Sequence, residues 1–195
     1  MPTKQLLLVR HGQPDEGHAL RPGDPPLTSF GHAQARALAL RRLAFEPIDR
    51  IVCSPQQRAM DTAAPLARLL GLDAELIEGL AECDRHSARY RSPETIRREE
   101  PQRWEEFLAS PPRFLGRDPD AFRQTVLDTF ASLLSDAHGR TVAVFSHGMP
   151  IKTLVAHAMR MPGTETFSLD HCSVTRIVGS ALDDMRVRTL NESTP

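Results

Sequence analysis

Arginine, histidine and glycine stand together where a short apolar run ends. Arg10, His11 and Gly12 directly follow the run at residues 5–9, which predicts a strand buried on both faces. A neutral histidine is nucleophilic near pH 7, and a guanidinium can bind two oxygens of one phosphate group. A following glycine lets a backbone N–H approach a ligand. The tripeptide makes His11 a candidate nucleophile beside a phosphate-binding arginine, but taken alone it also fits an ordinary strand end.

A second histidine and glycine occupy the same position after another apolar run. His147 and Gly148 follow residues 141–145. The carboxyl ends of parallel strands meet at one edge of a sheet, where ligands bind in open α/β proteins. We therefore expect His147 to lie on the same edge as His11.

Two further charged side chains follow predicted strands. Arg58 lies in SPQQRAMDTA at residues 54–63, and Glu82 lies in LAE. We expect Arg58 on the exposed first turn of a helix, where helix N–H groups also favour an anion. A carboxyl group beside bound phosphate retains its proton more easily, so Glu82 is a candidate acid.

The elements that must position these residues alternate between strands and helices. Apolar runs predict strands at residues 5–9, 48–53, 73–77, 141–145 and 174–178. Helix formers and apolar spacing predict helices at 29–43, 56–70, 119–137 and 150–161, with Thr28 or Ser29 as a cap and a kink or restart at Pro65. This alternation predicts an α/β fold with three α/β/α layers and a mainly parallel central sheet.

The segment at about 84–118 does not continue this alternation of strands and helices. It is rich in arginine and proline and predicts one amphipathic helix at about 93–108 but no buried strand. We interpret it as a small, mostly helical, cap-like insertion over the active site, within one domain spanning 1–195. Its basic side chains either recognise a second anionic group of the substrate or form a solvated surface; the candidates for recognition are Arg85, His86, Arg89 and Arg91.

Composition narrows the class of protein. The 195 residues carry a net charge of −1, which gives no electrostatic basis for binding nucleic acid or an anionic membrane. The cysteines are widely spaced, which argues against a disulfide framework or a zinc site; they are Cys53, Cys83 and Cys172. The apolar run Leu6 to Val9 is too short for a signal peptide or a membrane span, so we expect a cytoplasmic protein.

Together the motifs resemble those of the histidine phosphatase superfamily, also called phosphoglycerate mutase-like. The resemblance lies in LVRHG at 8–12, LTSFGHAQA at 27–35, SPQQRAMDTA at 54–63, LAE ending at Glu82 and VFSHG at 144–148. It implies that His11 becomes phosphorylated and that Arg10, Arg58 and His147 hold the phosphoryl group. Glu82 would donate a proton to the leaving oxygen and later take one from water. Substrate-binding roles are expected for Gly12, Gln13 and Gly148 as well.

The resemblance further implies no metal, no cofactor, a small-molecule phosphate ester as substrate and a possible homodimer. Within the family we favour a phosphatase over a phosphoglycerate mutase. The asparagine that mutases carry after RHG is Gly17 here, and their glycine-rich acidic stretch after the glutamate is replaced by CDRHSARYRS.

Two alternatives remain open besides the mutase. A catalytically inactive member would only bind a phosphorylated ligand. A metal-dependent hydrolase would use His11, His18 and His147 with Asp15 or Glu16, but it leaves Arg10 and Arg58 unexplained.

Finer expectations concern individual side chains. Nδ1–H of His11 is expected to donate to a backbone carbonyl, which leaves Nε2 free for phosphorus. Cys83 is expected to pack rather than react. The remaining histidines are interpreted as bystanders, with a substrate contact left open only for the first of them: His18, His32, His138, His157 and His171.

Overall fold

A computed structural model describes residues 3–164 and 167–193. Its described residues form one sheet of six strands in the order β3-β2-β4-β1-β5-β6. The strands are β1 (Lys4–Arg10), β2 (Arg50–Cys53), β3 (Ala74–Leu76), β4 (Thr141–Ser146), β5 (Val174–Gly179) and β6 (Arg186–Glu192).

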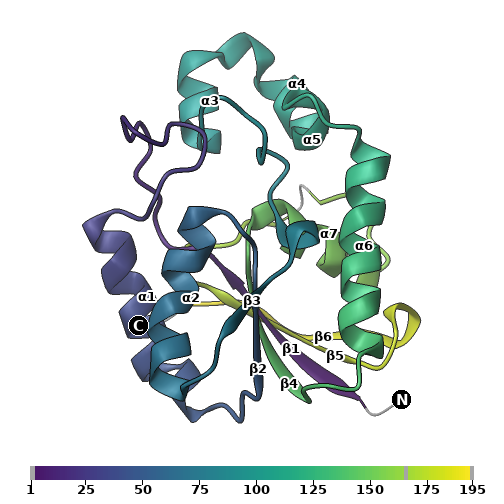
Figure 1. Ribbon diagram of the computed structural model, residues 1–195. Helices are drawn as coiled ribbons and strands as arrows, with labels where there is room; N and C mark the ends of the chain where they lie inside the picture. The colour runs from purple at the N-terminus through teal and green to yellow at the C-terminus, as the bar shows by residue number, and fades with distance from the viewer. Residues whose placement is uncertain (1–2, 165–166, 194–195) are drawn as a thin grey trace.

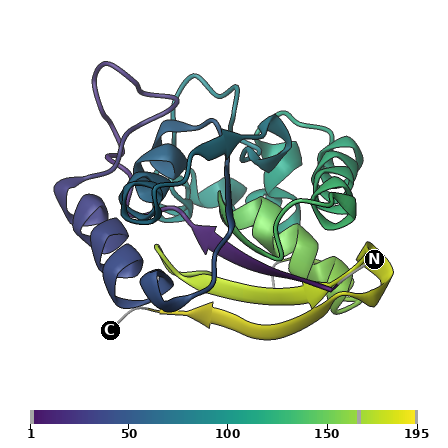
Figure 2. The same cartoon turned by 60° about the horizontal axis from the view of Figure 1, so that its bottom comes forward.

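The centre of the sheet is parallel. β4 pairs in parallel with both β1 and β2, and β2 pairs in parallel with β3. β5 pairs antiparallel with β1 and with β6, and Figure 2 shows these last two strands side by side at one edge. The expected mainly parallel α/β sheet is confirmed, but β6 was not predicted. Most of its residues are polar and exposed or half-buried, so it lacks the apolar run that marks an inner strand.

Helices cover both faces of the sheet, which gives three layers (Figure 1). One face packs against α1 (Ser29–Arg41) and α2 (Gln57–Leu70), and the other packs against α6 (Pro119–Ser135) and α7 (Gly148–Ala158). Successive strand residues face opposite layers. Leu7 and Val9 belong to the core under α1 and α2, whereas Leu6 and Leu8 belong to the core under α6 and α7.

The helix ends follow ordinary capping chemistry. The Thr28 side chain caps α1 by accepting from the backbone N–H of Gly31, which confirms one of the two expected caps. α2 ends at Gly71, whose φ of 66° is left-handed. α2 continues through Pro65 as one helix, so the alternative of a restart was wrong, whereas the kink stays a prediction.

The segment at residues 84–118, from here on called the insertion, contains short helices. They are α3 (Pro93–Glu99), the 3-10 turn η3 (Pro101–Arg103), α4 (Trp104–Ala109) and α5 (Pro111–Phe114). The single helix expected at 93–108 is therefore wrong. Glu100 precedes Pro101 and has φ −130° and ψ 56°, because proline disfavours the helical conformation in the residue before it.

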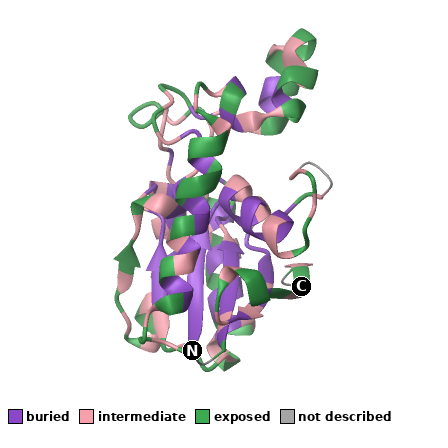
Figure 3. Ribbon diagram, turned by 90° about the vertical axis from the view of Figure 1, so that its right-hand side faces the viewer, coloured by how far each residue is buried: buried purple, intermediate pink, exposed green. Residues whose placement is uncertain are grey.

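The insertion has a small core of its own. Ile96, Phe107 and Phe114 are buried together, apart from the two cores of the sheet. Figure 3 shows largely exposed and half-buried residues around this core, in contrast to the buried strands. The short turn η2 (Glu78–Leu80) leads from β3 toward the insertion. In Figure 1 the helices of the insertion, α3, α4 and α5, lie at the top, beyond one end of the sheet. None of the described helices has both the length and the apolar character needed to cross a bilayer.

Candidate active site

The sheet brings the two histidines together, as the sequence predicted. In the parallel pairing of β1 with β4, Arg10 lies opposite Ser146. His11 follows Arg10 and His147 follows Ser146, so the two histidines leave the sheet side by side. The backbone N–H of His11 donates to the Ser146 carbonyl at 3.0 Å. The two imidazole rings lie 5.1 Å apart between centroids.

His11 is held in one tautomer. Its Nδ1 lies 2.8 Å from the carbonyl oxygen of Gly12; a carbonyl only accepts, so Nδ1 carries the proton and Nε2 has a free lone pair. The side chain is almost fully buried. Burial, followed by the charges of Arg58, His147 and Arg10, holds the pKa of His11 well below its usual value. His11 is therefore neutral near pH 7, with the tautomer that we expected.

Arg58 lies at the start of α2 but is fully buried, so the expectation of an exposed first turn was wrong. Its Nη2 donates to both carboxylate oxygens of Asp84, at 2.8 and 2.9 Å. The guanidinium carbon lies 4.7 Å from the centroid of the Tyr90 ring, and Asp24 lies 3.7 Å from Nη1. Asp84 and Tyr90 both belong to the insertion, and their contacts with Arg58 explain its burial.

Several buried nitrogen atoms around His11 have no hydrogen-bond partner among the described residues. They are Nε and Nη1 of Arg58, Nε of Arg10, Nδ1 of His147 and Nε2 of His171. Arg10 donates through Nη1 to the carbonyl of Leu169, and Nε2 of His147 lies 2.7 Å from Oγ of Ser54. Burial, followed by the charge of Arg58, holds the pKa of His147 well below its usual value. Unpartnered buried donors are costly, so this arrangement is typical of a site for an oxyanion.

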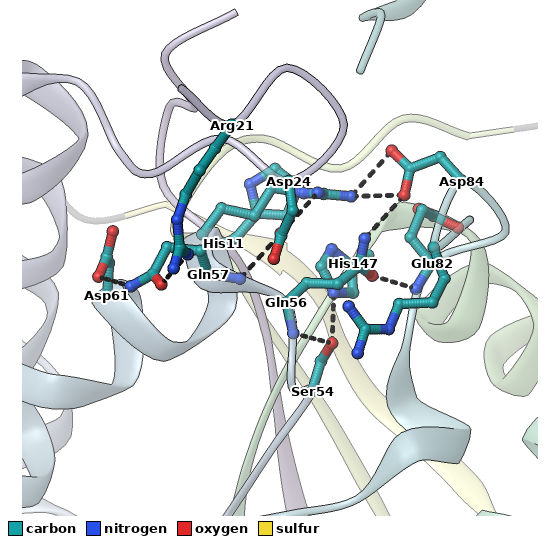
Figure 4. A network of polar contacts seen from close by, with 12 residues as sticks. His11, Arg21, Asp24, Ser54, Gln56, Gln57, Asp61, Glu82, Asp84 and His147 are labelled. Atoms are coloured by element: carbon teal, nitrogen blue, oxygen red, sulfur yellow. Dashed lines mark hydrogen bonds and ion pairs between the residues drawn. The ribbon is translucent and has the colours of Figure 1, made fainter. Parts of the chain in front are cut away.

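Glu82 is anchored by two backbone N–H groups. Its Oε1 accepts from Cys83 at 2.8 Å, and its Oε2 accepts from Met149 at 3.0 Å. The Gln56 side chain connects it to Asp84: Oε1 of Gln56 accepts from the backbone N–H of Glu82, and Nε2 donates to Asp84 (Figure 4). Burial, followed by the charge of Asp84, raises the pKa of Glu82 despite both backbone hydrogen bonds. The carboxyl group is thus disposed to hold a proton.

Gly12 allows close packing of the backbone, whereas the sequence led us to expect that it would let a backbone N–H approach a ligand. Its N–H donates to Oγ1 of Thr62 at 3.0 Å and so is already occupied. A Cβ at Gly12 would lie 2.9 Å from the carbonyl oxygen of Gly31, a distance that forces a shift. The residue lets the start of α1 approach the strand end closely.

Gln13 and Gly148 lie on the open side of the site. Gln13 is exposed, and its Oε1 accepts from the Thr28 hydroxyl at 2.9 Å. Gly148 begins α7 directly after His147. Both border a cavity of about 970 Å³ together with Arg10, His11, Arg58 and Glu82. Gly12 and His147 do not line this cavity.

His171, interpreted as a bystander from the sequence, lies beside His11 in the structure. Its ring centroid lies 5.6 Å from that of His11, and the residue lines the cavity. Burial, followed by the charge of Arg10, lowers the pKa of His171 to about 4. Asp84 and Tyr90 were also missed as partners of Arg58. No spacing rule marks these residues, because they come from irregular segments without a strand or helix of their own.

The arginines of the insertion mostly face glutamates. Arg85 contacts Glu78 at 2.9 Å, and Arg89 contacts Glu99 at 3.1 Å. Arg91 pairs with Glu100. Of the four residues considered for recognising a second anion, Arg91 alone lines the cavity, and His86 is exposed.

The cysteines and the acidic residues do not assemble a metal site in the part of the chain that the structure describes. All three cysteines are buried and unbonded to one another, as expected for Cys83. Within residues 3–164 and 167–193, no group of three or more His, Cys, Asp or Glu side chains is placed to hold a metal ion. The ligand set proposed for a metal-dependent hydrolase is thus not brought together.

Comparisons with known proteins identify relatives along nearly the whole chain. The model of the histidine phosphatase superfamily (branch 1) matches residues 6–193. A bifunctional protein of Mycobacterium tuberculosis is 34% identical over 170 residues, which is 81% of this chain and 44% of that protein. The chain thus spans less than half the length of this relative.

Solved structures share the fold. A mycobacterial glucosyl-3-phosphoglycerate phosphatase in complex with VO3 superimposes with a TM-score of 0.79 at 23% identity, covering 97% of this chain and 100% of that one. A phosphoserine phosphatase mutant from Entamoeba histolytica, in complex with phosphoserine, superimposes with a TM-score of 0.75 at 22% identity and covers 96% of both chains.

Proposed function

This chain belongs to the histidine phosphatase superfamily, and on that premise we propose that it is a phosphomonoester phosphatase with His11 as its nucleophile. The observation that carries the proposal is the set of unpartnered nitrogen atoms of Arg10, Arg58 and His147 around a neutral imidazole. Phosphoryl transfer chiefly requires positioning and positive charge around the equatorial oxygens. These three side chains supply both.

In the first step, Nε2 of His11 attacks phosphorus while the bond from phosphorus to the ester oxygen breaks. Glu82 gives its proton to that oxygen, and the alcohol leaves. The raised pKa of Glu82 favours this role, because the acid form must be present before the bond breaks. His147 gains a proton more readily once a phosphoryl dianion lies beside it.

In the second step, a water molecule attacks the phosphohistidine. Glu82, now a carboxylate, takes a proton from the water, and the bond from Nε2 to phosphorus breaks. Phosphate leaves and His11 is neutral again. Glu82 acts as acid and then as base at one position, between the backbone N–H groups that hold it.

The substrate class is a small-molecule phosphate ester, in keeping with relatives named as phosphatases of phosphorylated small molecules. The two-step reaction needs no metal, because guanidinium and imidazolium groups provide the positive charge. The homodimer and the cytoplasmic location stay predictions.

Trapping the intermediate tests the proposal. After rapid quenching, the enzyme turning over a ³²P-labelled ester should carry acid-labile, base-stable label, and His11→Ala should carry none. Turnover of p-nitrophenyl phosphate should be unchanged by EDTA. Full labelling of His11→Ala would contradict the assigned nucleophile, and loss of activity in EDTA that Mg²⁺ or Zn²⁺ restores would favour the metal-dependent alternative.

A further inference from the structure

We propose that the enzyme selects phosphomonoesters whose leaving group is large, apolar and uncharged. This inference rests on the proposed function and names the substrate class of the same site. The leaving group would contact side chains of the insertion that line the cavity, from here on called the apolar wall: Trp104, Phe107, Leu108, Pro111 and Leu115.

The size of the cavity is the first argument. Its volume of about 970 Å³ lies near the upper end of cavities that hold drug-sized ligands, roughly 300–1,000 Å³. A phosphoryl group on His11 fills only a small part of this space. The remainder is lined by residues of α4 and α5 as well as by those at the end of the sheet and would accommodate a substantial leaving group.

The apolar wall is held in place by its own packing. The rings of Trp104 and Phe107 stack with centroids 5.4 Å apart, and Phe107 meets Phe114 edge to face, also at 5.4 Å. Leu108 is 39% exposed although it lines the cavity. Apolar surface that remains accessible inside a cavity favours an apolar ligand, which removes it from water.

The charges on the cavity lining do not favour a second anionic group. Outside the phosphoryl site, four acidic residues line the cavity, namely Asp15, Glu16, Glu94 and Asp170, against three basic residues, namely Arg91, Arg98 and Lys152. Arg91 pairs with Glu100, and Arg98 lies 3.8 Å from Glu99. A carboxylate or second phosphate on the substrate would therefore meet no excess of positive charge.

A pair of alkyl phosphates tests this inference without changing the reactivity of the bond. Ethyl and n-hexyl phosphate have leaving alcohols of nearly equal acidity, so a difference in kcat/KM reports contacts of the chain. Full burial of one methylene raises kcat/KM about fourfold. n-Hexyl phosphate has four methylenes more than ethyl phosphate. With partial burial of these methylenes, we expect its kcat/KM to exceed that of ethyl phosphate by about 20-fold or more. A hexyl phosphate that ends in a carboxylate should lose most of this advantage.

Leu108→Ala localises the effect. Truncating this side chain should reduce the ratio of n-hexyl to ethyl kcat/KM by about fivefold. Leu69→Ala is the matched control, because Leu69 is 45% exposed on α2 and does not line the cavity; its ratio should equal that of the wild type. Thermal unfolding should show that both variants are folded.

The outcomes separate this inference from the proposed function. Hydrolysis of both esters with a ratio near one, or a preference for the carboxylate-terminated ester, would overturn the inference alone. A Leu108→Ala ratio equal to that of the wild type would overturn the assigned wall. Failure to hydrolyse either ester, without labelled phosphohistidine, would overturn the proposed function and this inference with it.

Discussion

The end of the sheet and the insertion both place arginines against carboxylates, yet the pairs differ in their surroundings. At the end of the sheet, Arg58 pairs with Asp84, the first residue of the insertion, and their side chains are 0% and 7% exposed. In the insertion, those of Arg103 and Glu106 are 43% and 51% exposed. The first pair lies where charge interacts strongly, whereas water and salt screen the second.

This difference decides which arginine keeps donors that a ligand could use. Asp84 fixes one end of the Arg58 guanidinium and leaves Nε and Nη1 without a hydrogen-bond partner among the described residues, with Asp24 3.7 Å from Nη1, so the guanidinium can still bind an oxyanion. Arg103 directs all its nitrogen atoms at Glu100 and Glu106. The sequence alone does not distinguish these two arginines. Their burial and the number of hydrogen-bond donors that remain available do distinguish them.

The largest effect is expected at the nucleophile. His11→Ala should reduce kcat/KM by about 10⁴-fold or more, as for other covalent nucleophiles. The control is His86→Ala, since His86 is an exposed histidine of the insertion and its removal should leave the rate unchanged. Near-normal turnover by His11→Ala in steady-state assays would mean that the end of the sheet is not the reactive region.

The next effect concerns Glu82. Glu82→Gln keeps the size but only one of the two backbone contacts, because an amide has a single acceptor oxygen, and it cannot donate the proton. We expect kcat/KM for ethyl phosphate to fall by roughly 10²–10⁴-fold. p-Nitrophenyl phosphate should lose less, because nitrophenolate leaves without a proton. An equal loss on the two esters would contradict the assignment of Glu82 as the acid.

A smaller effect should follow from Asp84→Asn, which removes the carboxylate that faces Arg58. The free energy of unfolding should fall by about 3 kcal/mol in urea titrations, because a buried arginine loses its charged partner, and kcat/KM should fall by roughly tenfold.

The same variant should change the pH profile. Asp84 raises the pKa of Glu82, so removing its charge lowers that pKa. Glu82 then loses its proton at lower pH, and the alkaline limb of kcat/KM for ethyl phosphate should move to lower pH. Asp183→Asn, an exposed control, should move neither limb. A shift of the alkaline limb to higher pH would contradict the electrostatic coupling.

The smallest effect is expected in the insertion. Glu106→Gln removes a carboxylate that contacts Arg103 at 2.9 Å, but the pair is exposed and contributes little. Activity and Tm should both match the wild type. A loss comparable to that of Asp84→Asn would erase the distinction drawn between the two regions.

The sequence predicts those parts of the site that depend on the ends of regular strands. His11 and His147 follow apolar runs, and parallel pairing of these runs is sufficient to bring the two rings together. The antiparallel β6 could not be predicted in the same way, because its residues show no apolar run.

Residues that act through irregular segments were not predictable from spacing. Asp84 buries Arg58 only because the insertion returns to the start of α2, and His171 reaches His11 from a turn before β5. The helix expected at 93–108 fails for a local reason, namely Pro101, whose effect on Glu100 could have been read from the sequence.

The contact between His147 and Ser54 has a consequence for turnover. A hydroxyl group can donate to a bare ring nitrogen or, after rotating, accept from a protonated one. Nε2 of His147 therefore keeps its partner whether the imidazole is neutral or cationic. The ring can gain a proton when a dianion arrives and lose it when phosphate departs without having to swing out of place.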